Sequence, residues 1–289
     1  MQDLRQRRFD AAILFQNAFE AAFIAYRARI PCRLGYARDG RGFLLSHAVR
    51  IDPEVRTVHQ AYYYLGILAG AGLIESGPWR SGTWNLDIRI GVRDADRETA
   101  AHMLRQEGIL PGQPVVGINP GAYYGSAKRW LPERYARVAD ALASRYGARI
   151  LVFGSAGESV LAAEIAGRMA HVPVIFAGKT TLGQLMGLIE RCALFITNDS
   201  GPMHLAAALG IPQVAIFGST SDVATGPLSR NAEIIRVPVD CSPCFLRECP
   251  TDLRCMTGIT VERVLTSAVS RLDQKQAVPP RASLPESQL

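Results

Sequence analysis

A polar stretch that follows an apolar run is the part of this sequence best suited to chemistry. Residues 194–197, LFIT, predict a buried strand, and NDSGPMH follows as residues 198–204. Ser200 and Gly201 stand where a helix N-cap is expected, and Pro202 suits the first helical turn. The unpaired N–H groups and the positive dipole end of such a helix favour a phosphate. The stretch therefore predicts an anion site.

Two side chains of this stretch add what backbone amides lack. Asp199 can accept hydrogen bonds from sugar or ribose hydroxyls, and His204, one turn into the helix, can donate to phosphate oxygens. Each also has an ordinary interpretation, Asp199 as a turn or capping residue and His204 as a surface histidine. Their combination with a second loop, described next, favours a nucleotide-sugar site.

The second loop follows the apolar segment 115–119 and reads PGAYYGSAKRW over residues 120–130. Its glycines allow the backbone to approach a ligand closely, and Lys128 or Arg129 can neutralise a diphosphate. Taken alone, the same pattern is typical of a surface loop with solvated charges. Trp130, next to Leu131, is expected to pack beside the loop rather than to bind sugar.

The second half of the chain alternates apolar runs with amphipathic segments. Strands are predicted at residues 115–119, 149–153, 174–176, 194–197 and 213–217, and helices at 132–146, 159–169, 182–192 and 203–209. This order predicts an α/β fold with a parallel sheet covered on both faces. Ligands bind beyond the carboxyl ends of such strands, where the loops with Lys128 and Asp199 begin.

The first half predicts a smaller set of elements, with strands at 10–16 and 33–36 and helices at 18–29 and 57–70. A linker is expected at residues 111–114, which gives one domain over 1–110 and another over 111–273. Residues 274–289, rich in Gln, Pro and Ser with isolated charges, are expected to be disordered.

Composition and charge limit the expected location of the chain and the classes of partner that it could bind. The chain has 289 residues, of which 48% are hydrophobic, and its longest uncharged apolar run, 61–74, is shorter than the roughly 20 residues a bilayer crossing requires. The charged N-terminus shows no secretory signal, so a cytoplasmic location is expected. A net charge of +6 suits an anionic nucleotide or an anionic membrane face. Lys and Arg are scattered, so no nucleic-acid partner is expected.

Three motifs together are far more specific than each alone: NPGA at 119–122, SAKRWLPERY at 126–135 and TNDSGPMH at 197–204. With them the chain resembles the ADP-heptose:lipopolysaccharide heptosyltransferases of glycosyltransferase family 9, of the heptosyltransferase II type, from about residue 9 to 272. The resemblance implies a GT-B fold, with two Rossmann-like domains facing a cleft, an acceptor-side N-terminal one and a donor-binding C-terminal one. It also implies inverting transfer of heptose from ADP-heptose to the lipopolysaccharide inner core on lipid A. Peripheral contact with the cytoplasmic face of the inner membrane is part of that expectation.

The resemblance implies a donor site on the two loops. Its expected members are Gly121, Ala122, Ser126, Lys128, Asp199, Ser200, Gly201 and His204. Ser126 and Lys128 are expected at the diphosphate, and Asp199 at the sugar hydroxyls. The departing ADP needs its negative charge stabilised, which a helix N-terminus, Lys128 and His204 can do as supporting groups without a required cofactor.

The catalytic base is the point at which the sequence departs from the family. Inverting transfer needs a base for the acceptor hydroxyl, and the resemblance places it on an aspartate that follows a glycine after the first N-terminal strand. No Gly-Asp pair occurs in this sequence, so the N-terminal domain is expected to be incomplete, through a misplaced gene start or as a truncated relic. Glu20, Asp39 and His47 are other candidates, but such side chains in polar segments are usually solvated. The base therefore stays unknown.

Four cysteines crowd into one short segment, Cys241, Cys244, Cys249 and Cys255. Stable disulfides are not expected in the cytoplasm, so a CxxC with two further cysteines suggests structural zinc. The spacing is not a standard zinc pattern, and reduced, packed or redox-active thiols are the alternative.

Two other functions stay open. One is a different GT-B nucleotide-sugar enzyme with the same phosphate architecture, which donor screening would separate. The other is a non-catalytic ADP-sugar-binding remnant, which the absent Gly-Asp pair favours.

Overall fold

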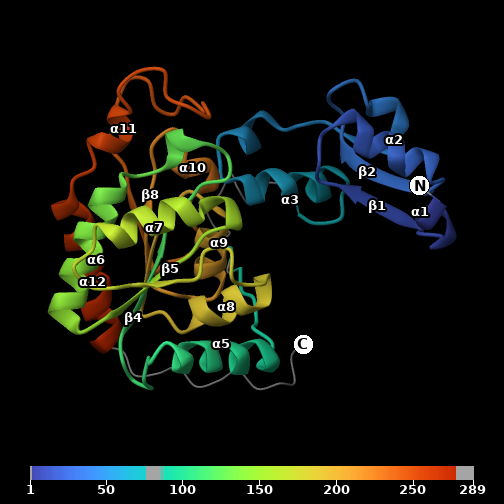
Figure 1. Ribbon diagram of the computed structural model, residues 1–289. Helices are drawn as coiled ribbons and strands as arrows, with labels where there is room; N and C mark the ends of the chain where they lie inside the picture. The colour runs from blue at the N-terminus through green and yellow to red at the C-terminus, as the bar shows by residue number, and fades with distance from the viewer. Residues whose placement is uncertain (1, 76–85, 87, 278–289) are drawn as a thin grey trace. The chain divides into compact units, whose positions relative to one another are not determined.

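The computed structural model describes residues 2–75, 86 and 88–277 (Figure 1). The chain forms two compact units, unit 1 comprising Met1–Leu86 with Val223–Thr225 and unit 2 comprising Asp87–Asp222 with Gly226–Leu289. The division lies earlier than the boundary expected after residue 110. The reason is that α5 (Asp94–Gln106) packs on α8 (Leu182–Glu190) within unit 2.

Unit 2 contains a six-stranded, wholly parallel sheet in the order β6-β5-β4-β7-β8-β9. The strands are β4 (Val115–Asn119), β5 (Arg149–Val152), β6 (Val174–Ile175), β7 (Leu194–Asn198), β8 (Gln213–Ile216) and β9 (Ala232–Ile235). The parallel sheet and five of its strands are confirmed as predicted from the sequence, and β9 is an addition. The two central strands β4 and β7 are buried throughout, because helices cover both faces.

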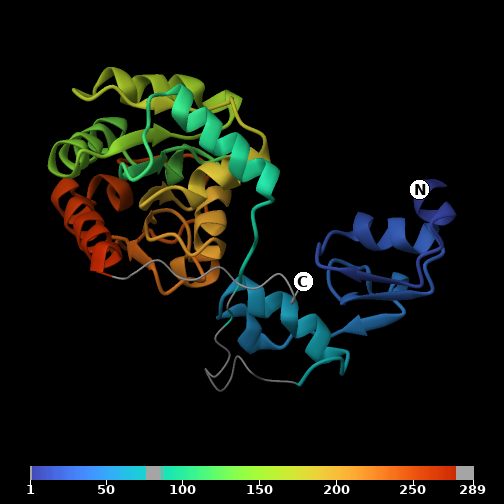
Figure 2. The ribbon, with the colours of Figure 1, turned by 90° about the horizontal axis from the view of Figure 1, so that it is seen from below.

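Helices cover both faces of this sheet (Figures 1 and 2), and each face has its own core. One core joins α6 (Pro132–Tyr146), α7 (Ser159–Gly167) and α12 (Val261–Ala277) to Val116 and Ile118 of β4. The other joins α5, α8 and α9 (Gly201–Ala208) to Val115 and Phe195. Successive residues of β4 therefore serve opposite faces, as the side-chain alternation of a strand requires.

Local signals set several helix ends. Pro132 opens α6, and Gly147, with a φ of 62°, ends it in the left-handed conformation that glycine adopts readily. Residues 274–277 continue α12, so the disorder expected from residue 274 onward is wrong for these residues. The remaining tail residues, 278–289, lie outside the described residues. Two further short helices are α10 (Asp222–Thr225), whose last three residues belong to unit 1, and α11 (Arg254–Thr257) of unit 2.

Unit 1 is a three-stranded parallel sheet in the order β1-β2-β3 with helices α1 (Gln2–Gln6), α2 (Phe19–Arg27) and α3 (Gln60–Gly70). Its strands are β1 (Ala11–Leu14), β2 (Cys32–Tyr36) and β3 (His47–Val49), the last of which the sequence did not predict. Tyr36, Tyr63 and Ile67 form its main core, and the Tyr36 hydroxyl donates to the Tyr63 carbonyl at 2.5 Å. Burial raises the pKa of Tyr36 to about 12. Among the described helices of both units, none has the length and hydropathy to cross a membrane.

Candidate donor site

The loops that follow β4 and β7 leave the sheet at the same edge. The two strands pair in register, with Asn119 opposite Thr197. At this edge the Lys128 ammonium group donates to Asp199 Oδ2 at 2.6 Å, and the two side chains are only 14% and 5% exposed. The structure thus brings together the two motifs that sequence reasoning singled out.

A third loop joins this pair. Thr220, which follows β8, donates its hydroxyl hydrogen to the same Asp199 Oδ2 at 2.7 Å. Asp199 therefore connects the loops that follow three neighbouring strands of the sheet, β4, β7 and β8. Thr220 was not predicted as a site residue, and the only signal for it in the sequence is its place just after a predicted strand. The expected contact of Asp199 with sugar hydroxyls stays a prediction.

Two buried asparagines at the strand ends hold the loop after β4. Asn198 Oδ1 accepts from the Trp130 N–H at 3.2 Å and from the Tyr135 hydroxyl at 2.9 Å, and its amide nitrogen donates to the Pro120 carbonyl at 2.6 Å. Burial raises the pKa of Tyr135 well above its usual value, which keeps the phenol a donor. Asn119 donates to Ser200 Oγ at 3.2 Å. Neither asparagine was predicted as a site residue from the sequence, although each is a polar residue at the end of an apolar strand.

The start of α9 has the form that the sequence predicts. Ser200 is the N-cap residue and Pro202 lies in the first turn. The Ser200 side chain makes no capping bond and instead lies 3.1 Å from Thr197 Oγ1. A methyl group on Gly201 would meet no atom within 4 Å, so the space before this residue is open. His204 is exposed on the first helical turn. These features leave the helix N-terminus accessible to an anion.

The remaining predicted members lie along the loop after β4. Gly121 is buried, and a methyl group there would overlap the Glu158 carboxylate. Ala122 is also buried, and its carbonyl accepts from Arg129 at 3.3 Å. Ser126 is exposed and opens a short 3₁₀ turn, Ser126–Lys128.

Trp130 packs as predicted. It is 1% exposed, its indole N–H donates to the Ile259 carbonyl at 3.0 Å, and its ring meets Tyr135 edge-on at 5.0 Å. A residue so enclosed serves the core beside the loop.

The three titratable candidates for a base lie in unit 1 and are exposed. Glu20 lies in the first turn of α2, and Asp39 lies 3.3 Å from Arg38 in a turn with a φ of 53°. His47 is in β3, with Nδ1 3.0 Å from Ser46 Oγ. None has the burial that commonly tunes a general base, so no residue is assigned that role.

The four clustered cysteines are free thiols. Across residues 2–75, 86 and 88–277, no three His, Cys, Asp or Glu side chains converge in a way that could hold a metal ion. Structural zinc at Cys241, Cys244, Cys249 and Cys255 therefore gains no support from the geometry and stays a prediction. Burial raises the pKa of the Cys255 thiol, whereas hydrogen bonds from Thr251 lower that of Cys249.

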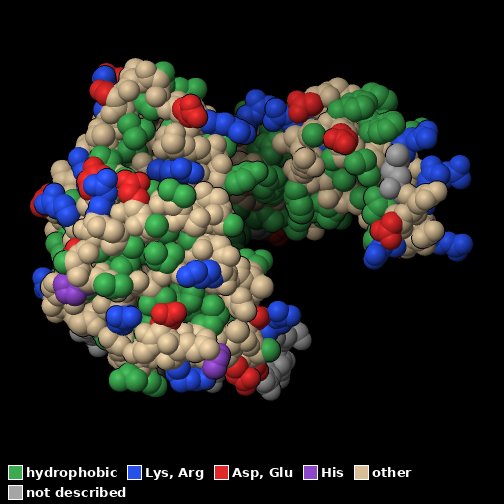
Figure 3. Space-filling view, viewed as in Figure 1, with side chains coloured by type: hydrophobic (Ala, Val, Ile, Leu, Met, Phe, Trp, Pro, Cys, Tyr) green, Lys and Arg blue, Asp and Glu red, His purple; other side chains and the backbone are tan. Residues whose placement is uncertain are grey.

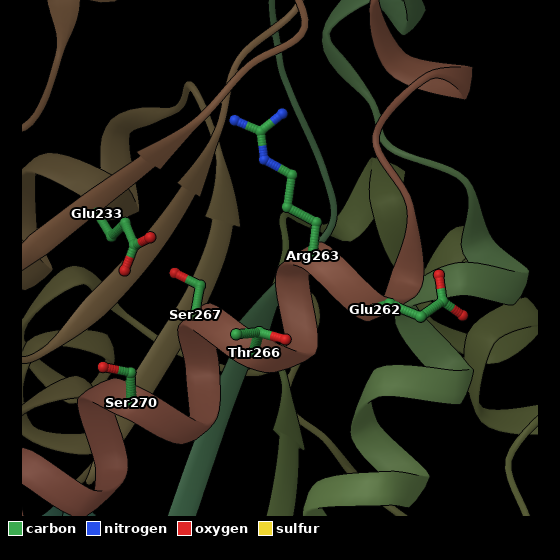
Figure 4. Close-up of a pocket in the computed structure, with 6 residues that line it drawn as sticks. All are labelled: Glu233, Glu262, Arg263, Thr266, Ser267 and Ser270. Carbon is green, nitrogen blue, oxygen red and sulfur yellow. The ribbon is translucent and has the colours of Figure 1, made fainter.

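A cavity of about 430 Å³ lies elsewhere in unit 2 (Figure 4). It is formed by β9 and α12 and lined by Glu233, Glu262, Arg263, Thr266, Ser267 and Ser270. None of these residues belongs to the predicted donor site. The candidate site is thus recognised by its charges and its helix terminus, not by the volume of a cavity.

Comparisons with known proteins identify relatives of this chain. The family model "Glycosyltransferase family 9 (heptosyltransferase)" matches residues 1–254. Lipooligosaccharide heptosyltransferase 2 of Haemophilus influenzae is 33% identical over 237 residues, which are 80% of this chain and 67% of that protein. Lipopolysaccharide heptosyltransferase 2 of Escherichia coli is 33% identical over 239 residues, 81% of this chain and 67% of that protein.

Solved structures match over almost the whole chain. The ADP-heptose lipopolysaccharide heptosyltransferase II of Escherichia coli superposes with a TM-score of 0.78 at 29% identity, covering 95% of this chain and 80% of that one. The glycosyltransferase family 9 protein of Veillonella parvula, 24% identical with a TM-score of 0.79 over 94% of this chain and 77% of that one, shares the fold. These matches confirm the expected GT-B type of α/β fold. The chain belongs to glycosyltransferase family 9, the heptosyltransferase family.

Proposed function

We propose that this protein is a heptosyltransferase of the heptosyltransferase 2 type, which transfers heptose from ADP-heptose to the inner core of lipopolysaccharide with inversion. The observation that carries the proposal is the buried Lys128–Asp199 pair beside the open N-terminus of α9, in a chain of this family. A cation and free helix amides at one sheet edge suit the diphosphate of a nucleotide sugar.

The proposed chemistry follows from where charge develops. When the bond between heptose and phosphate breaks, negative charge grows on the departing β-phosphate. The N-terminus of α9, the Lys128 ammonium group and the exposed His204 can stabilise that charge. Asp199 holds the ammonium group at 2.6 Å and so fixes its position before the donor arrives. Gly201 leaves room for the phosphate to approach the helix amides.

The proton of the acceptor hydroxyl needs a separate base. The family resemblance assigns it to an aspartate after a glycine, and this sequence contains no such pair. Donor binding by unit 2 and complete transfer are therefore two properties to be measured separately. The ADP-sugar-binding alternative differs from the enzyme only in the second.

We also propose that unit 1 contacts an anionic membrane face, where the lipid-linked acceptor would be found. Three exposed phenylalanines lie together on unit 1: Phe19, Phe23 and Phe43 are 43%, 40% and 77% exposed. The ring centroid of Phe19 lies 6.3 Å from that of Phe23 and 6.2 Å from that of Phe43. Arg27 lies over the Phe23 ring at 6.0 Å. Aromatic and basic side chains together suit a lipid interface. On the face of unit 2 visible in Figure 3, acidic and basic side chains are interspersed instead.

Vesicle binding tests this contact. We expect the protein to sediment with anionic vesicles more than with neutral ones, and the double variant Phe19→Ser with Phe43→Ser to lose most of that binding. Val172→Ser, which changes an 81% exposed side chain on unit 2, is the matched control. Equal sedimentation of the double variant and the control would contradict the proposed contact.

Heptose transfer tests the main proposal. The assay measures turnover of ADP-heptose on a mono-heptosylated lipid A core acceptor by this chain, by Lys128→Ala and by Arg168→Ala, which changes an exposed cation on the C-cap of α7. Transfer by the wild type and the control, strongly reduced in Lys128→Ala, supports the enzyme. Binding of ADP-heptose without transfer supports the binding-only alternative, and preference for another nucleotide sugar supports the other GT-B enzyme.

A further inference from the structure

The cysteine-rich segment, residues 241–255, docks on the loop that carries Lys128. The Ala127 N–H donates to the Arg247 carbonyl at 3.0 Å, and the Tyr124 hydroxyl donates to the Phe245 carbonyl at 2.8 Å. A methyl group on Gly125 would overlap the Arg247 backbone. The segment therefore forms one wall of the loop after β4, although the family motifs lie outside it.

The same segment is also tied to the loop after β8. The Phe245 N–H donates to the Ser219 carbonyl at 2.8 Å, and the Ser242 hydroxyl donates to the Gly218 carbonyl at 2.6 Å. Thr220, which follows Ser219 in the chain, donates to Asp199. The cysteine-rich segment thus bridges two of the three loops that meet at the Lys128–Asp199 pair.

This docking places the Arg247 side chain on the same aromatic ring that Lys128 contacts. The Arg247 guanidinium carbon lies 5.2 Å from the centroid of the Tyr124 ring, and the Lys128 ammonium nitrogen lies 5.2 Å from the same centroid. The two cationic groups are therefore separated by no more than twice that distance. Contact with the ring face stabilises each cation.

The two cations differ in how their charge is compensated. Lys128 donates to the buried Asp199 carboxylate, so that pair has no net charge. Arg247 is exposed, and within the described part of the chain it forms no ion pair. The N-terminus of α9 adds about half a positive charge. A nucleoside diphosphate, with a formal charge on each phosphate, needs more positive charge than this helix and the neutral pair provide.

We propose that Arg247 is a second phosphate-binding cation of the donor site, brought there by the cysteine-rich segment. Its planar guanidinium group can donate two parallel hydrogen bonds to a phosphate, which an ammonium group cannot. The inference rests on the proposed function, because it assumes that an ADP-linked donor binds at this sheet edge. It gives the cysteine-rich segment a role in binding that requires no metal.

Calorimetric titration with ADP and with adenosine tests the proposal. In Arg247→Ala we expect the Kd for ADP to rise about tenfold and that for adenosine to change by less than about twofold, because only ADP presents phosphates. Arg247→Lys keeps the charge but not the fork, and should recover part of the affinity. Both substitutions leave the main-chain hydrogen bonds of the segment in place, and thermal unfolding checks that each variant is folded.

Arg145→Ala is the matched control, because Arg145 is also exposed and stacks on a tyrosine, Tyr146, at 5.4 Å. Its Kd for ADP should equal that of the wild type. If the wild type binds ADP and the folded Arg247→Ala variant binds it with the same Kd, Arg247 has no role in phosphate binding. The proposed function would then still stand. An equal loss for ADP and adenosine would show a structural role and also overturn it. Failure of the wild type to bind ADP would instead overturn the proposed function, and the inference with it.

Discussion

Lys128 Nζ lies 2.6 Å from Asp199 Oδ2 although the two residues are 71 positions apart in the chain. One ion pair, almost fully shielded from water, thus joins the loop after β4 to the start of α9. Removing one partner of such a pair leaves the other charge buried without compensation. Loss of either partner alone is therefore expected to destabilise unit 2 as well as to affect the donor.

Breaking this pair should cost more than breaking an exposed one. We expect Asp199→Ala to lower the free energy of unfolding by about 3 kcal/mol, because Lys128 and Thr220 both lose their acceptor. In the double variant Lys128→Met with Asp199→Leu, part of this loss should be recovered. Urea unfolding measures each value. Glu164→Ala, which breaks the exposed pair with Arg168, should cost at most about 1 kcal/mol. A similar cost for both single variants would contradict the expected difference.

Gly125→Ala tests whether the loop after β4 needs the close approach of the cysteine-rich segment. The new methyl group would overlap the Arg247 backbone, so the loop or the segment must move. Since Gly125 has an extended φ of 165°, the effect comes from this contact and not from backbone strain. We expect kcat/KM for heptose transfer, or the affinity for ADP if transfer is absent, to fall at least about tenfold.

Gly167→Ala is the control for that variant, because a methyl group there meets no atom within 4 Å. Its activity and binding should match the wild type. If Gly125→Ala also matches the wild type, the segment does not position the loop.

Gly201→Ala separates binding from stability at the start of α9. In the free protein a methyl group at this position meets no atom within 4 Å, so the free energy of unfolding should change by less than about 0.5 kcal/mol. A bound phosphate must come close to this backbone, and the methyl group would occupy that space. The expected result is normal stability with an ADP affinity lowered about tenfold. Unchanged affinity would place the phosphate elsewhere.

The elements nearest the site could be predicted from the sequence because their signals are local. The bounds of β4 and α6 match the predicted residues, with Pro132 and Gly147 marking the ends of the helix. The position of α5 was missed for the opposite reason. Its buried face includes only Ala100 and Leu104, and its partner α8 follows far along the chain. A weak apolar pattern of this kind gives no sign of the unit to which it belongs.

The site residues also differ in whether a local signal in the sequence predicts them. Lys128, Asp199 and Ser200 stood out because charge, an N-cap and a strand end coincide in short motifs. Thr220 and Arg247 lie in loops outside these motifs, and only the folded arrangement gives them partners near that pair. The sequence predicted that the loops with Lys128 and Asp199 meet, but it did not reveal that the loops with Thr220 and Arg247 join them.

The link between α6 and the segment after α7 predicts a pH dependence of stability. Asp140 accepts from the N–H groups of Ala170 and His171, both at 2.9 Å, and lies 3.1 Å from the His171 ring. Partial burial acts to raise the pKa of Asp140, but these hydrogen bonds outweigh it and hold the pKa below its usual value. Because the folded pKa is depressed, the stabilisation is present above the unfolded value of about 3.9 and is lost as the pH falls through the folded pKa.

Asp140→Asn should therefore be less stable than the wild type by about 1 to 2 kcal/mol at pH 7. The difference should shrink as the pH falls below about 4, because protonation removes the advantage of the wild-type carboxylate. Urea unfolding between pH 7 and low pH measures it. Glu98→Gln, which changes an exposed side chain on α5, is the matched control and should differ little from the wild type at any pH. A difference for Asp140→Asn that persists undiminished in acid would mean that shape, rather than the charge of the carboxylate, holds this connection.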